Sequence, residues 1–162
     1  MSINSVKSYL ASKAPSISLT GTIWVAVHGY TQRPKREKVG DNVILAVGDV
    51  RRREDRLSMP RGSAEKENVY QVSILLYAAH SDEIGGGNHF DALIENACDV
   101  YRRATPGNPT LVDAITGQTS YLTYIGENIE VRTFPPEMTA PQGRTEFRAV
   151  LTLQVKEILS PA

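Results

Sequence analysis

The chain has 162 residues, of which 41% are apolar and 22% are charged. This length suits one domain with its own core, and the composition excludes a chain that is disordered throughout. Eighteen basic residues balance eighteen acidic ones, so the overall charge does not favour a nucleic acid or a membrane as the main partner.

The cysteine content and the hydropathy exclude further classes of protein. Cys98 is the only cysteine, which excludes an intrachain disulfide and a zinc site made of cysteines. The chain lacks the run of about eighteen apolar residues that crosses a bilayer, and its N-terminus lacks the basic and apolar segments of a secretory signal. We therefore expect a protein that folds in the cytoplasm, has no membrane contact and is stabilised by packing.

Apolar periodicity predicts two helices and five or six strands. The spacing of Phe90, Leu93 and Ile94 is that of a helix with one apolar face, whereas the alternation from Phe147 to Val155 is that of a strand with one buried face. In chain order, the predicted elements are a helix over Ile3–Ala14 that ends at Pro15, strands over Ile23–Val27, Asn42–Val47 and Val69–Ala79, a helix that is capped by Asn88 and ends before Pro106, a pair of strands over Tyr121–Tyr124 and Ile129–Phe134, and a strand over Glu146–Glu157.

The connections between these elements are polar. Tyr30–Gly40 is basic, Ser81–Gly87 is predicted to be a turn because it holds three successive glycines, and Gly126–Asn128 is predicted to join the pair of strands. Trp24, the only tryptophan, is predicted to anchor the core. Because helices and strands do not alternate regularly, the sequence predicts a single α+β domain over residues 1–162, with a mostly antiparallel sheet and both helices on one face.

The charged stretch Gly48–Asn68 shows no apolar period and is predicted to be a long loop between the second and third strands. Loops longer than about 12–15 residues are uncommon inside domains and are often functional. Fixing each backbone residue costs about 1–2 kcal/mol, and the stretch has few apolar side chains to offset that cost. We therefore expect a contact arm that a neighbouring subunit or a ligand orders, with an idle solvated loop as the alternative. Its candidate interface residues are Arg51, Arg52, Arg53, Arg56 and Arg61.

A search for catalytic, cofactor-binding or metal-binding motifs finds none that is specific. His80 and His89 straddle the glycine turn and, with Asp91, form the best candidate for a catalytic or metal centre, but acids at this position are explained by the helix start alone. Gly85–Gly87 is not followed by Lys-Ser or Lys-Thr, so it is not a phosphate-binding loop. Cys98 continues the apolar face of the helix and is predicted to be buried. We expect no enzyme and no cofactor.

The order of these elements resembles one known family. A strong strand, Val69–Tyr77, leads into the helical segment Phe90–Ile94; a strand that ends at Tyr124–Glu127 follows, and Glu146–Glu157 closes the fold. In this order and texture, the chain resembles the tail terminator and tail-completion proteins of long-tailed bacteriophages, which cap the tail tube and join it to the head.

The resemblance implies an α+β protein that forms a closed ring, usually of six copies, around the channel through which DNA passes. Its partners would be further copies of itself, the tail tube protein and a head-completion or neck protein. DNA would only pass through the lumen, and the protein would lie in the virion at the head–tail junction. No catalytic residue is implied, and the arginines of the charged stretch would lie at a subunit junction, at the tube contact or towards the lumen.

Other functions fit the sequence as well. A head-completion or neck connector has similar sequence texture. A small nucleic-acid-binding module would use Arg51–Arg53 together with the basic segment Arg33–Lys38, but no aromatic residues lie among these arginines to stack on bases.

Overall fold

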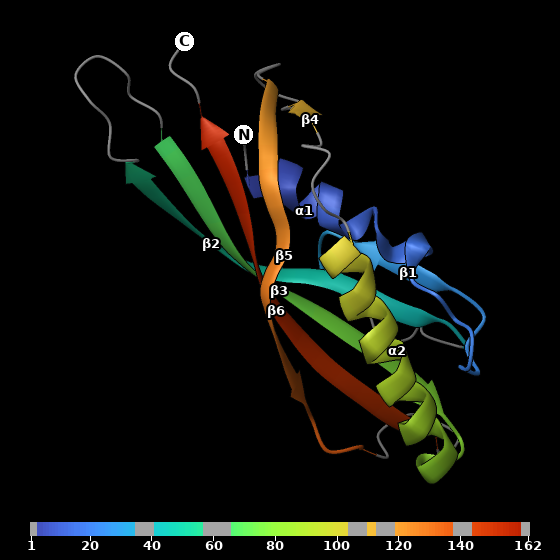
Figure 1. Ribbon diagram of the computed structural model, residues 1–162. Coiled ribbons are helices and arrows are strands. Elements are labelled where there is room, and N and C mark those ends of the chain that lie inside the picture. The colour runs from blue at the N-terminus through green and yellow to red at the C-terminus, as the bar shows by residue number, and fades with distance from the viewer. Residues whose placement is uncertain are drawn as a thin grey trace.

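The computed structural model describes residues 3–34, 41–56, 66–103, 110–112, 119–137 and 144–159. Within these ranges, six strands form one sheet in the order β1-β2-β3-β6-β5-β4 (Figure 1). The elements are α1 (Ile3–Ala11), the 3₁₀ turn η1 (Ala14–Ser16), β1 (Val27–Tyr30), β2 (Val43–Arg56), β3 (Lys66–His80), α2 (Glu83–Arg103), β4 (Thr110–Val112), β5 (Thr119–Thr133) and β6 (Thr145–Leu159). The β1–β2 pair is parallel and every other pair is antiparallel, which confirms the predicted α+β class and the mostly antiparallel sheet.

Both helices pack on the same face of the sheet, as the sequence predicts (Figure 1). We call this the helix-bearing face and the opposite one the open face. The hydroxyl of Tyr101 in α2 donates a hydrogen bond of 3.0 Å to the carbonyl of Leu10 in α1, which ties the two helices together. Burial raises the pKa of Tyr101, so the hydroxyl keeps its proton. The strand residues buried beneath the helices include Val43, Leu45, Val47, Val72, Ile74, Leu76, Leu151, Leu153 and Val155.

The central strands follow the sequence prediction closely. The alternation over Val69–Ala79 and Glu146–Glu157 corresponds to β3 and β6, which pair along their full lengths from Lys66 opposite Leu159 to His80 opposite Thr145. The helices cover one face of each strand, and that face must be apolar. The hydropathy pattern therefore predicts where each of these strands begins and ends. Within the described ranges, no helix combines the length and the apolar character that a membrane span needs.

The first strand and the first helix differ from the prediction. α1 ends at Ala11, before the expected Ala14, and β1 covers Val27–Tyr30 instead of Ile23–Val27. Trp24 lies before β1, and its indole Nε1 donates a hydrogen bond of 3.1 Å to the carbonyl of Ala79 at the end of β3. The predicted anchoring role of Trp24 is confirmed, since its side chain is buried in the core.

The charged stretch Gly48–Asn68 is not the long loop that the sequence predicts. β2 runs on through Gly48 to Arg56, and β3 begins at Lys66, so both ends of the stretch belong to one antiparallel hairpin. Residues 57–65 lie outside the described residues. The prediction failed because it required apolar alternation, whereas backbone hydrogen bonds to β3 hold this part of β2. Within the described part, the chain itself therefore orders the stretch, without the partner that the entropy argument required.

The second helix begins earlier than predicted. α2 starts at Glu83, so the three glycines lie in its first turns and Asn88 is inside the helix instead of capping it. The carboxylate of Asp82 accepts a hydrogen bond of 3.2 Å from the N–H of Ile84, as a capping residue does. Gly86 lets the helix approach β6, because a Cβ at this position would lie 2.8 Å from the ring of Phe147.

Two neighbouring glycines of α2 therefore respond differently to alanine. Gly86→Ala is expected to lower the free energy of unfolding by about 1–3 kcal/mol, since the new methyl group overlaps the Phe147 ring. Gly87→Ala is expected to raise it by about 0.5–1 kcal/mol, because its Cβ would meet Phe147 at an ordinary 3.8 Å and alanine favours a helix. Urea unfolding followed by circular dichroism measures both. Equal effects of the two substitutions would contradict the close approach at Gly86.

The segment after α2 also departs from the prediction. The expected pair of strands around Gly126–Asn128 is one long strand, β5, whose register against β6 shifts between Leu122 and Glu130. Asn128 has φ of 53°, in the left-handed region that asparagine tolerates. The turn residues are thus absorbed as bulges, which bend a strand without ending it. The short strand β4 pairs with the start of β5 and was not predicted.

Candidate functional site

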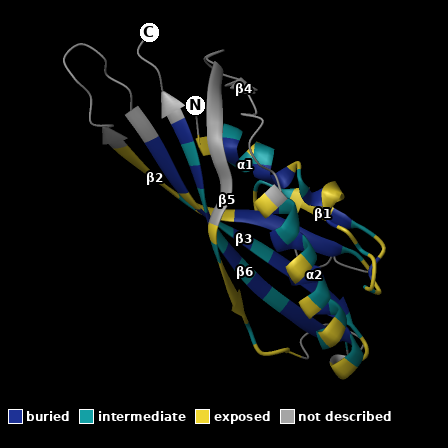
Figure 2. Cartoon of the chain, in the orientation of Figure 1, coloured by how far each residue is buried: buried dark blue, intermediate teal, exposed yellow. Residues whose placement is uncertain are grey.

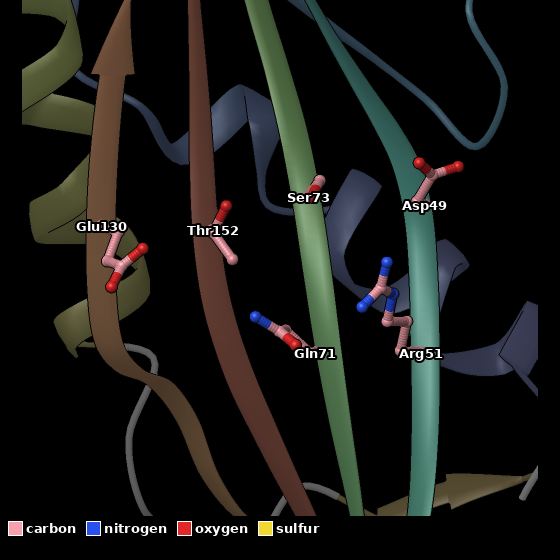
Figure 3. Close-up of a pocket in the computed structure, with 6 residues that line it drawn as sticks. All are labelled: Asp49, Arg51, Gln71, Ser73, Glu130 and Thr152. Atoms are coloured by element: carbon pink, nitrogen blue, oxygen red, sulfur yellow. The ribbon is translucent and has the colours of Figure 1, made fainter.

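The open face of the sheet carries a polar hollow of about 270 Å³ that spans four neighbouring strands (Figure 3). Its middle is uncharged, whereas charged side chains lie at its two sides: Asp49 and Arg51 on β2, and Glu130 on β5 (Figure 3). The remaining lining residues are Gln71 and Ser73 on β3 and Thr152 on β6. The charged residues of the hollow thus lie on β2 and β5, and the uncharged ones lie on the two strands between them.

The predicted interface arginines do not form one patch. Because successive residues of a strand point to opposite faces, Arg51 and Arg53 lie on the open face, whereas Arg52 lies on the helix-bearing face opposite Tyr70. Arg56 pairs with Lys66 in the hairpin backbone, and its side chain is not described. Arg61 lies outside the described residues. The strand structure therefore separates arginines that look like a cluster in the sequence.

The first outer edge of the sheet is the far half of β2. β1 pairs with β2 only at Val43–Ala46, so no strand of the described part covers the outer side of β2 from Val47 to Arg56. On this segment Val47 is buried, whereas the residues from Gly48 to Glu54 are exposed or half-buried (Figure 2). An uncovered edge presents backbone N–H and C=O groups that can pair with another strand.

The second outer edge is formed by β5. β4 pairs with β5 only through Thr119–Tyr121, and the remainder of β5, Leu122–Thr133, has no outer neighbour among the described strands. Val131 on this segment is 44% exposed. Sequence reasoning missed this edge because it divided β5 into a pair of strands.

A buried polar pair lies where the hairpin meets β6. The side-chain Nδ2 of Asn68 donates a hydrogen bond of 3.0 Å to the Glu157 carboxylate, and both residues are buried, at 2% and 0% exposure. Burial raises the pKa of the nearby Tyr70, and the negative charge of Glu157 raises it further. The sequence held no signal for this pair, because the two residues are 89 positions apart.

The two histidines of the suggested catalytic or metal centre do not face each other. His80 accepts a hydrogen bond of 3.0 Å from the backbone N–H of Asp82, whereas His89 donates one of 2.5 Å to the carbonyl of Gly21. His80 thus binds the backbone two residues on, and His89 binds the backbone of a segment 68 residues away. In the described part of the chain, no group of three or more His, Cys, Asp or Glu side chains is arranged to hold a metal ion. Cys98 is buried, as predicted, and burial raises its pKa.

The chain matches no known family model, and no curated protein matches it either.

Proposed function

We propose that this protein forms a closed ring that caps the tail tube of a long-tailed bacteriophage, ends tube polymerisation and provides the surface that joins head and tail. The observation that carries the ring is the presence of two unlike free edges, Val47–Arg56 and Leu122–Thr133, on opposite sides of one sheet. A contact between unlike surfaces is heterologous, and such contacts generate rings when the rotation closes. The assignment to a phage tail is suggested by the order of helices and strands, which resembles that of tail terminator proteins.

The mechanism is geometric. One face of a six-membered ring would match the end of the tail tube and stop further addition of tube subunits, and the other would receive a head-completion or neck protein. DNA would pass through the lumen, for which the balanced charge of the chain, with eighteen basic and eighteen acidic residues, is suitable. A strongly basic lumen would hold DNA, because each neutralised phosphate adds affinity. Such a protein needs neither a catalytic residue nor a cofactor.

A nucleic-acid-binding module is less well supported than the ring. Such a module needs its basic groups on one surface that follows the phosphate backbone. Arg51 and Arg52 point to opposite faces, and acidic side chains lie beside both, at Asp49 and Glu54. Acidic and basic side chains that alternate along a strand suit a contact with another protein strand that carries charges of both signs.

Purified protein is expected to form closed rings that negative-stain electron microscopy resolves. Added to polymerising tail tube protein, these rings are expected to shorten the tubes and to appear at their ends. Binding to the portal-side proteins in a pull-down, without binding to the tube protein, would instead identify a neck connector. A protein that stays monomeric and never joins a tube would refute the proposal.

A further inference from the structure

The two free edges of the sheet fit each other, and we infer that they form the contact between neighbouring subunits. In this contact the free edge of β2 pairs antiparallel with the free edge of β5 in the next copy. Arg51 lies opposite Glu130 of that copy, and Asp49 lies opposite Arg132. The inference rests on the ring assembly proposed above and supplies its contact.

The strand directions favour this contact. β2 is antiparallel to β3, β3 to β6 and β6 to β5, so β2 and β5 run in opposite directions within one subunit. Rotation of a copy about an axis slightly inclined to the strands nearly keeps these directions, and the inclination offsets neighbouring edges along the strands. The β2 edge of one copy then meets the β5 edge of the next as an antiparallel pair, the slightly more stable kind of ladder.

The flanking strands leave room for this contact. With Arg51 opposite Glu130, residues 48–51 of one copy face residues 130–133 of the next, where β5 pairs regularly with β6. β1 covers β2 only at Val43–Ala46, and β4 covers β5 only at Thr119–Tyr121, so both short strands lie beyond the ends of the contact. In this register, neither flanking strand obstructs the approach of the two edges.

The charges select this register. On the open face, Arg51 meets Glu130 and Asp49 meets Arg132, which makes two pairs of opposite charge. Asp49 and Glu130 lie in one row across the sheet, because Asp49 lies beside Ser73, Ser73 pairs with Thr152 and Thr152 pairs with Glu130. A shift of two residues from the proposed register would therefore place Asp49 of one copy opposite Glu130 of the next. Like charges directly opposite each other are destabilising.

The apolar residues support the same register. On the helix-bearing face, the half-buried Val50 lies opposite Val131, whose side chain is 44% exposed in the single subunit. Pairing therefore covers an apolar side chain that the subunit leaves in water. A slip of one residue would place Arg51 opposite Val131 and bring side chains of opposite faces together. Charged residues on an edge also prevent unselective pairing with other strands.

Disulfide crosslinking tests the register directly. Residues that lie opposite each other in an antiparallel pair have Cα atoms about 4.5–5.5 Å apart, within the range that a disulfide spans. The double variant Val50→Cys, Val131→Cys is expected to give a ladder of crosslinked multimers under mild oxidation. The control Val50→Cys, Thr133→Cys places the thiols two residues out of register and is expected to remain largely monomeric on a denaturing gel. Crosslinked dimers from Val50→Cys alone would instead indicate that two β2 edges meet, and would overturn the inference.

Charge exchange tests the same contact without oxidation. Arg51→Glu and Glu130→Arg are each expected to raise the protein concentration for half-maximal ring formation about tenfold or more, because each replaces an attractive pair by a repulsive one in every contact. The double variant is expected to restore assembly. Glu95→Arg makes the same charge change on the exposed side of α2 and is expected to leave assembly unchanged. Analytical ultracentrifugation compares these four variants with the wild type.

The outcomes separate this inference from the proposed function. If wild-type rings cap tail tubes but the double charge exchange fails to restore assembly, the edge contact is wrong and the tail function stands. If the exchange restores rings and these never bind a tail tube, the edge contact stands and the tail function is wrong.

Discussion

Replacing Trp24 by alanine is expected to lower the free energy of unfolding by about 3–5 kcal/mol. Its indole packs edge-on against Phe90, with ring centroids 6.1 Å apart, and is 5% exposed. It also donates the hydrogen bond to the Ala79 carbonyl that holds the segment before β1 against the end of β3. Alanine removes the large indole side chain, its aromatic contact with Phe90 and the hydrogen-bond donor together. Small domains are stable by about 5–15 kcal/mol, so the variant would lie near the limit of folding.

Trp24→Phe is the matched control, because it keeps an aromatic ring against Phe90 and removes the N–H donor. Its loss is expected to be smaller than that of Trp24→Ala and to include the cost of leaving the Ala79 carbonyl without this donor, about 1–3 kcal/mol for a buried group. Urea unfolding monitored by circular dichroism measures both variants. A loss below about 1 kcal/mol for Trp24→Ala, less than the usual cost of such a core truncation, would show that the residue is not an anchor.

Asn68→Asp is expected to cost about 3 kcal/mol at pH 8, although it changes the shape of the side chain very little. Asn68 donates to the buried Glu157 carboxylate, and in the hairpin it also lies opposite Glu54. The substitution replaces the donor by a third carboxylate, which lies between those of Glu157 and Glu54. Like charges raise the pKa of the introduced carboxyl in the folded state above its unfolded value of about 3.9.

This shift fixes the direction of the pH dependence. A carboxyl with a raised pKa binds its proton more tightly in the folded protein, so the variant loses stability relative to the wild type as pH rises above about 4. Unfolding measured between pH 4.5 and pH 8 is expected to show a growing difference from the wild type. Asn4→Asp, the same chemical change at an exposed position of α1, is expected to stay within about 0.5 kcal/mol throughout. A difference that does not change with pH would contradict the close approach of the carboxylates.

The parts of the fold that the sequence predicts best are those that touch the helices. β3, β6 and the body of α2 show clear periods because each buries one face in the core. The outer half of β2 gave no such signal, because its pairing is made by the backbone and its side chains lie in water. The start of α2 was missed for a different reason. Glycine usually disfavours a helix, but close packing against Phe147 requires it here.

The candidate site was only half predictable for a related reason. The sequence drew attention to Arg51, through the density of charge around it, but not to Glu130 or Arg132 on β5. Those residues become relevant only when most of β5, beyond the short β4, is known to be an outer edge of the same sheet. Pairing between copies leaves no period in the hydropathy of one chain. The three-dimensional order of the strands was needed to place the two edges on opposite sides.

The central position of β6 has a consequence for the timing of folding during synthesis. β6 pairs with β3 on one side and with β5 on the other, yet it follows both of them in the chain. While the ribosome is still making residues 145–159, the β2–β3 hairpin and β5 therefore lack the strand that joins them. Contacts between such distant segments form slowly, and incomplete sheets expose edges that aggregate. The sheet can present both of its free edges only after Leu159 has left the ribosome, so the proposed contact between subunits would form only once the fold is complete.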